Sequence, residues 1–200
     1  MRPRVAAALC TLCVFVWLAA EVMGGRTVRF DENARALIHQ WSAPPLTAAM
    51  KEVSVMGSAA VSVPLILAAL LLFRRKLWRP TVLLLATAGG AGLLDQILKH
   101  LFIRARPEPF FGITASHLSS FPSGHALLAS YLYAALASTI AARVSARWLR
   151  AAVWCAAILL IAAIGFSRVY LGEHYPTDVL AGYAAGCTWF LAVSWALDQR

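Results

Sequence analysis

Long apolar stretches alternate with short polar segments along the whole chain. Six of these stretches approach the roughly 20 residues that a helix needs to cross the hydrocarbon core of a bilayer. They cover residues 5–22, 53–73, 81–103, 122–142, 151–166 and 177–197. The pattern predicts an all-α fold, a polytopic membrane bundle of six transmembrane helices that forms one domain over residues 1–200.

The segment at residues 30–50 is too polar to cross a membrane, but it has helical periodicity. An acidic start at Asp31 suits the positive end of a helix dipole, and apolar residues recur at helical spacing as far as Trp41. The Pro44-Pro45 pair is expected to end this helix. We predict an amphipathic helix on the membrane surface, and a loop helix packed on the bundle fits the pattern equally well.

Composition and charge also indicate a membrane protein. Charged residues make up 14% of the chain, against about a quarter in soluble domains. The basic residues that give the net charge of +9 lie mainly in loops and termini on one side of the six-span arrangement, as the positive-inside rule requires. They are Arg2, Arg4, Arg74, Arg75, Lys76, Arg79, Arg143, Arg147, Arg150 and Arg200. This placement argues against nucleic-acid binding and predicts that both termini are cytoplasmic. Residues 23–52, 104–121 and 167–176 then face the outer side.

The first apolar stretch shares features with a signal peptide, namely a basic start and small residues near Ala19-Ala20. Glu21 is a poor neighbour for cleavage, so we favour an uncleaved span. Cleavage would leave the orientation of the later spans unchanged.

All four cysteines lie within apolar stretches. Disulfides belong mainly to the loops of small extracellular domains, and no histidine or third cysteine accompanies the first pair. We therefore predict free thiols that are buried as small hydrophobic side chains. The residues are Cys10, Cys13, Cys155 and Cys187.

The first of three polar segments on the outer side carries Lys99 and Arg106. Residues seven apart return to nearly the same face of a helix, so a span that continues to Arg106 presents both cations along one stripe. Arg104 falls on another face and is expected to contact lipid headgroups or solvent. Asp95 lies one turn before Lys99 and is expected to pair with it. Taken alone, Lys99 and Arg106 also fit ordinary cations at a membrane border.

The second segment is Pro122-Ser123-Gly124-His125, at the start of the fourth span. Serine suits a helix N-cap, and glycine allows close approach of a ligand to the backbone. Free amides and the helix dipole favour an anion there, and His125 is placed to exchange a proton with it. A capped helix with a histidine at the membrane border is the alternative.

The third segment contains Arg168, His174 and Asp178. His174 and Asp178 share a face if a helix runs through both. The carboxylate can then fix the tautomer of the imidazole and leave its other nitrogen as a nucleophile. Arg168 adds a fork for phosphate oxygens. A structural Asp–His pair at a helix start is the alternative.

Together the three segments supply cations, amide donors, two histidines and one orienting carboxylate. These groups suffice for phosphoryl transfer without a metal, and the sequence has no acidic or histidine cluster suited to Mg²⁺ or Zn²⁺. We therefore expect no cofactor. His39, His100 and His117 lie outside these segments and are expected at the surface or an interface, although His117 is near enough to touch a substrate.

At these positions the chain resembles the type 2 phosphatidic acid phosphatase superfamily, with the motifs K-x6-RP, PSGH and SR-x5-H-x3-D at the family spacing. The motif core covers residues 99–178. The resemblance implies that His174 attacks phosphorus to form a phosphohistidine, that Asp178 orients it, and that His125 protonates the leaving oxygen. It also implies that the phosphate oxygens are held by Lys99, Arg106, Ser123, Gly124 and Arg168.

The resemblance further implies a phosphorylated lipid substrate. Polyprenyl diphosphates such as undecaprenyl diphosphate, phosphatidylglycerophosphate or phosphatidic acid, and lipid A phosphates are the candidate classes. The expected location is a bacterial inner membrane with the site on its outer face. Membrane lipids are the expected partners, with no nucleic acid and no obligate protein partner. A phosphotransferase with the same intermediate, and a lipid-binding or transport protein with an inactive site, are the alternatives.

Overall fold

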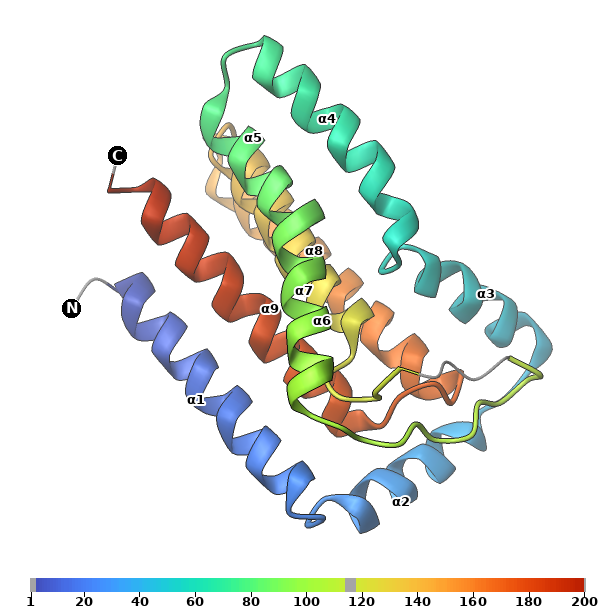
Figure 1. Cartoon of the computed structure of the whole chain (residues 1–200). Coiled ribbons are helices and arrows are strands. Elements are labelled where there is room, and N and C mark those ends of the chain that lie inside the picture. Colours follow the sequence, from blue (N-terminus) through green and yellow to red (C-terminus); the bar gives the residue numbers. More distant parts are fainter. Residues whose placement is uncertain (1–2, 114–117, 200) are drawn as a thin grey trace.

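The computed structural model describes residues 3–113 and 118–199, and within them every regular element is a helix (Figure 1). Five segments of the described chain are long and apolar enough to cross a membrane. Four are single helices: α1 (Pro3–Met23), α7 (Gly124–Ala141), α8 (Arg147–Tyr170) and α9 (Pro176–Leu197). The fifth covers Trp78–Leu101 and joins α5 (Trp78–Leu85), the π-helical turn η2 (Ala86–Ala91) and α6 (Gly92–Leu101). The all-α, multi-pass prediction is confirmed.

The predicted span at 53–73 is not a continuous transmembrane helix. It is divided among the end of α3 (Pro44–Val55), a short 3-10 turn (Ala59–Val61) and α4 (Ser62–Arg74). Because α4 has 13 residues, it is only about 20 Å long, well short of a bilayer core of about 30 Å. Five of the six predicted spans therefore meet the length that crossing requires.

The segment predicted as one surface helix forms two helices, α2 (Val28–His39) and α3. The prediction that Pro44-Pro45 ends a helix is wrong, because this pair starts α3 instead. Proline is tolerated there since the first amides of a helix have no acceptor within it. On α2 the polar residue Asp31 is buried, whereas the apolar residues Val28 and Phe30 are exposed. The helix thus turns a polar face toward the bundle and apolar side chains outward.

Helix α9 lies between α1 and α7 and packs closely against both. A side chain at Gly182 would collide with α7, because an added Cβ atom would lie 2.5 Å from the carbonyl oxygen of Ser123. Small residues at such crossings let two backbones approach closely. The backbone N–H of Ser123 donates to the carbonyl oxygen of Asp178 at 2.9 Å, so the first turns of α7 and α9 are joined.

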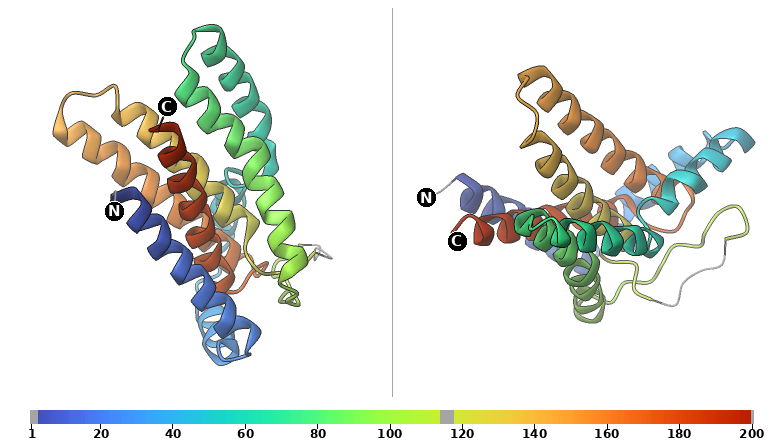
Figure 2. Two further views of the ribbon diagram at one scale, coloured as in Figure 1. Left: turned by 60° about the vertical axis from the view of Figure 1, so that its left-hand side comes forward. Right: turned by 90° about the horizontal axis from the view of Figure 1, so that it is seen from above.

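The direction of the helices gives the bundle two distinct ends. The starts of α7 and α9 meet the ends of α6 and α8 at one end, which holds the three polar segments. The described termini and the loop between α7 and α8 lie at the other end, and Figure 2 shows this loop standing away from the start of α1 and the end of α9.

The prediction that the cysteines are free thiols is confirmed, but the prediction that they are buried is wrong. All four cysteines are free, but Cys10, Cys13 and Cys155 are exposed on helix surfaces and Cys187 is half-buried. In a membrane bundle an apolar sequence fits both the core and the lipid-facing surface, so hydropathy alone does not distinguish the two.

Candidate active site

The first polar segment reaches the site through an extended loop. Helix α6 ends at Leu101 and residue 102 is extended, so the prediction of one helical stripe through Lys99 and Arg106 is wrong. Arg106 lies on the loop, where its Nε donates to the carbonyl oxygen of Leu118 at 2.9 Å. Its Nη1 lies 3.4 Å from Nε2 of His174. Because the helix ends before Arg106, the loop can place this guanidinium group beside His174.

His174 and Asp178 are held against each other at the start of α9. Nδ1 of His174 lies 3.6 Å from Oδ2 of Asp178, and both side chains are buried. His174 precedes the helix, so the predicted shared helical face is wrong. The carboxylate folds back because its Oδ2 accepts a hydrogen bond from the backbone N–H of Tyr175 at 2.9 Å. Ser120, which the sequence reasoning missed, donates to the same oxygen at 2.5 Å.

Arg104 is the main correction to the predicted site. Instead of pointing outward, its side chain is largely buried and bridges two buried carboxylates. Its Nη1 lies 2.5 Å from Oδ1 of Asp178, and its Nη2 lies 2.7 Å from Oδ2 of Asp31 on α2. Asp31 also accepts from the backbone and hydroxyl of Thr177 at 3.0 and 2.7 Å. In an extended segment residues two apart share a face, so recognising the loop as extended would have placed Arg104 beside Arg106.

Two further cations are oriented by carboxylates. Nζ of Lys99 donates to Oδ2 of Asp95 at 2.8 Å, which confirms the predicted pair. Arg168 is buried and contacts both Ser54 and the carboxylate of Glu173. Its Nε is buried without a hydrogen-bond partner in the part of the chain that the structure describes.

The second polar segment forms the start of α7. Ser123 is buried at the N-cap position, and its hydroxyl has no hydrogen-bond partner among residues 3–113 and 118–199. Gly124 has no room for a side chain, since an added Cβ atom would lie 2.8 Å from Oδ1 of Asp95. A helix start with unpaired donors suits an anion.

His125 lies in the first turn of α7, within electrostatic range of four groups of the site. Its charged or titratable neighbours are Lys99, Arg106, Arg168 and His174. His125 also lines a cavity of about 310 Å³ with Lys99, Gly124 and the apolar Leu128.

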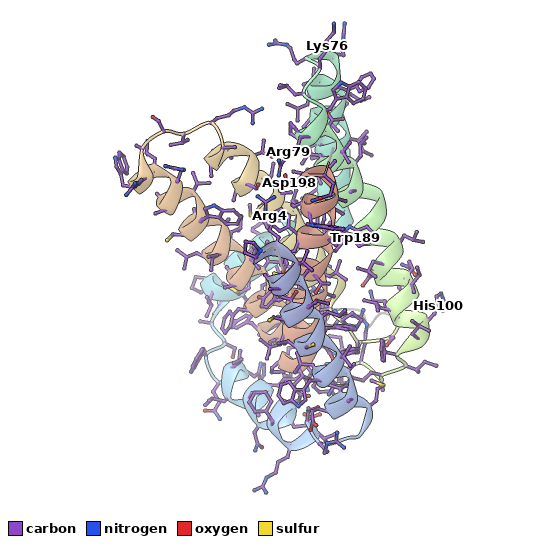
Figure 3. All side chains as sticks on the ribbon, turned by 90° about the vertical axis from the view of Figure 1, so that its left-hand side faces the viewer. Arg4, Lys76, Arg79, His100, Trp189 and Asp198 are labelled. Carbon is purple, nitrogen blue, oxygen red and sulfur yellow. The ribbon has the colours of Figure 1, made fainter. Side chains whose placement is uncertain are left out.

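We assign no catalytic role to the remaining histidines, although His100 borders a cavity with Lys99, Arg104 and Arg106. The ring of His39 stacks on Phe110 with the centroids 3.8 Å apart. His100 is exposed on α6, as Figure 3 shows. His117 lies outside the described residues. Among those residues, no three side chains of His, Cys, Asp or Glu gather in a way that could hold a metal ion.

Comparison with known proteins identifies the family of the chain. The model of the PAP2 superfamily matches residues 80–200, which is more than half of the chain. The chain belongs to the PAP2 superfamily. Phosphatidylglycerophosphatase B of Bacillus subtilis (strain 168) is 32% identical, and the match covers 93% of this chain and 92% of that protein. Undecaprenyl-diphosphatase of Sulfolobus acidocaldarius is 29% identical over 92% of this chain and 88% of that protein.

A solved structure shows the same fold. The crystal structure of the first transmembrane PAP2-type phosphatidylglycerolphosphate phosphatase from Bacillus subtilis superposes with a TM-score of 0.86 and 28% identity. The match covers 96% of both chains. This chain is therefore a multi-pass membrane protein with the PAP2 fold, and its class of activity is that of a phosphatase.

Burial sets the charge states of the loop residues in this PAP2 site. Burial lowers the pKa of His174, and the hydrogen bond and charge of Asp178 only partly oppose this effect. Burial also acts to lower the pKa of Arg104, but the carboxylates of Asp178 and Asp31 outweigh it and raise that pKa. The site thus combines a neutral imidazole with a fixed guanidinium cation.

We expect Arg104→Lys to lower kcat by about ten- to a hundredfold while changing KM little. A lysine keeps the charge but lacks the fork that holds Asp31 and Asp178 together, and a small misplacement of a catalytic group can cost about a hundredfold in rate. The control is Arg26→Lys, which alters an exposed arginine paired with Glu21. Equal kcat values for the two variants in a phosphate-release assay would show that Arg104 does not position the site.

The pH dependence of kcat/KM should have its acid limb below pH ~6.5, the ordinary pKa of histidine. Only neutral His174 has a free nitrogen lone pair, so activity is lost as the pH falls through its pKa, which burial lowers. Asp178→Asn removes a group that raises this pKa and should move the limb to still lower pH. The profile is corrected for ionisation of the substrate phosphate, and a limb above pH ~6.5 contradicts the assignment.

Proposed function

We propose that this PAP2 protein is an integral membrane phosphatase that hydrolyses a phosphomonoester or diphosphate on a lipid through a phosphohistidine at His174. The observation that carries the proposal is the orientation of that ring. Its Nδ1 lies against Asp178, and its Nε2 faces Arg106. A buried imidazole oriented by a carboxylate and aimed at a cation is arranged to attack an anionic phosphorus centre.

In the first step Nε2 of His174 forms a bond to phosphorus while the bond between phosphorus and the lipid oxygen breaks. His125 donates a proton to that leaving oxygen. In the second step water attacks phosphorus, its proton passes to His125, and the phosphorus–nitrogen bond breaks to release phosphate. Lys99, Arg106 and Arg168, with the hydroxyl of Ser123 and the amide of Gly124, stabilise the charge on the phosphate oxygens. The mechanism uses no metal or cofactor.

A lipid substrate fits the cavity beside His125. That cavity is polar at Lys99 and Gly124 and apolar at Ala91 and Leu128, which come from η2 and α7. A headgroup can then lie beside Lys99 and the start of α7 while its tail stays among the helices. The names of the relatives favour phosphatidylglycerophosphate and polyprenyl diphosphates as the first substrates to test.

The distribution of basic residues supports an orientation for the site. Arg143 in the α7–α8 loop and Arg4 at the start of α1 lie at the end of the bundle opposite His174, which favours a cytoplasmic location for that end. We therefore propose that the site faces the outer side of a bacterial inner membrane, with membrane lipids as its partners.

Purified protein in detergent should release inorganic phosphate from phosphatidylglycerophosphate or undecaprenyl diphosphate. His174→Ala should lower this rate by at least about a thousandfold, as loss of a nucleophile does in other enzymes. The control is His100→Ala, which removes an exposed histidine.

Acid-labile phosphate on the parent protein but not on His174→Ala supports the phosphohistidine. Transfer to a lipid acceptor without free phosphate indicates a phosphotransferase, and turnover of neither substrate overturns the assignment.

His125→Ala should slow hydrolysis of a lipid phosphate much more than hydrolysis of an activated aryl phosphate. An aryloxide leaves with little protonation, so loss of the proton donor costs less there, whereas loss of general acid catalysis for an alkoxide costs about a hundred- to ten-thousandfold. His174→Ala should slow both substrates alike. An equal loss for the two substrates in His125→Ala would contradict its role as the acid.

A further inference from the structure

A second basic cavity lies at the end of the bundle opposite His174. It has a volume of about 640 Å³. Four arginines line it, and they come from α1, α5, the loop after α7, and α8. They are Arg4, Arg79, Arg143 and Arg150. Four guanidinium groups from four parts of the chain therefore converge far from the site of phosphate cleavage.

One carboxylate fixes two of these arginines. Asp198 at the end of α9 contacts Arg4 through Oδ2, and its Oδ1 lies 2.6 Å from Nη1 of Arg79. Figure 3 shows the three side chains together at this end of the bundle. Since one carboxylate balances only one of two cations, this group retains a net positive charge beside the cavity.

The other two arginines have no carboxylate partner among the described residues. Nη1 of Arg143 donates to the carbonyl oxygen of Thr139 at 2.8 Å, and Nη2 of Arg150 donates to that of Ser145 at 3.3 Å. Each hydrogen bond uses one nitrogen and orients the guanidinium group without neutralising its charge. The remaining N–H groups are suited to bidentate binding of a phosphate group.

The walls of the cavity indicate what kind of anion it takes. Pro80, Leu83 and Trp154 give it apolar surfaces, and Ser138 and Thr139 add polar groups. These residues lie within about two turns of the ends of membrane-spanning segments, and tryptophan is common near such ends. A volume of about 640 Å³ suits an organic molecule of some size and far exceeds a phosphate ion.

Membrane topology by itself does not require this arrangement. The positive-inside rule asks only that basic residues lie on one side of the membrane. Arg74 and Arg75 at the end of α4 meet that requirement without lining the cavity. The convergence of arginines around an amphipathic cavity is therefore a feature beyond orientation.

We propose that this cavity binds the phosphate headgroup of an anionic phospholipid from the leaflet opposite the catalytic site. Arg143 and Arg150 hold the phosphate, while Arg4 and Arg79, oriented by Asp198, add long-range attraction. The acyl chains lie along the apolar walls between the α7–α8 hairpin and α5. Such a lipid joins the hairpin, whose loop stands away from the bundle in Figure 2, to the remaining helices.

The test measures the thermal unfolding of the full chain in neutral detergent during titration with phosphatidylglycerol, phosphatidylcholine or inorganic phosphate. A ligand that binds the folded state raises Tm. Phosphatidylglycerol should raise the Tm of the parent, and Arg143→Gln with Arg150→Gln should weaken its apparent affinity by about tenfold or more, as loss of charge-assisted hydrogen bonds predicts. Replacement of both by lysine should restore most of the affinity.

The matched control is Arg74→Gln with Arg75→Gln, which removes the same charge from the same end but outside the cavity. This control should bind phosphatidylglycerol with the affinity of the parent. Both double variants keep the catalytic site, so lipid bound there contributes equally to both. Equal weakening in the two double variants would show general attraction to basic residues and overturn the proposal. If inorganic phosphate raised Tm as much as phosphatidylglycerol does, the ligand would be a soluble anion and the lipid proposal would be overturned. An equal rise in Tm with phosphatidylcholine would also overturn the proposal.

Discussion

The site depends on one buried carboxylate being held in place. Burying an ionised carboxylate costs several kcal/mol unless hydrogen bonds compensate, and Asp178 is fully buried. Its oxygens accept hydrogen bonds from Arg104, Ser120 and the backbone of Tyr175. These donors come from the loop after α6, from the segment before α7, and from the start of α9. The need to satisfy one carboxylate thus fixes three segments relative to one another, and His174 is oriented as a result.

The same network explains why a polar helix lies beside the bundle. Asp31 of α2 binds the guanidinium of Arg104 on one side and Thr177 on the other, so α2 is tied directly to the first turn of α9. Removing one partner from such a buried ion pair leaves a charge without compensation, typically at a cost of about 3–5 kcal/mol. Helix α2 is therefore part of the structural support of the dyad formed by His174 and Asp178, although it carries none of the family motifs.

The bundle separates two kinds of positive charge. At the catalytic end, nearby acids orient Lys99, Arg104 and Arg168, whereas Arg106 is held by the carbonyl oxygen of Leu118. This arrangement keeps several cations close together before any phosphate is present, because the acids offset their mutual repulsion. At the opposite end Arg143 and Arg150 are held by carbonyl oxygens and keep their full charge. The acid-paired cations of the catalytic end are suited to stabilising a reacting phosphate. The arginines of the opposite end are suited to binding an anion without chemistry.

The sequence by itself determined the helical class, the position of five spans and the residues that carry the family motifs. These features depend on local hydropathy and on spacing along the chain, which are visible in one dimension. The tertiary structure alone decided where α6 ends, that the predicted span at 53–73 is divided among α3, a 3-10 turn and α4, and that Arg104 joins Asp31 to Asp178. The reason is that the partners of Arg104 lie more than 70 residues away in sequence on either side. A buried charge is stabilised by whichever opposite charge the fold brings to it, and that choice exists only once the helices have packed.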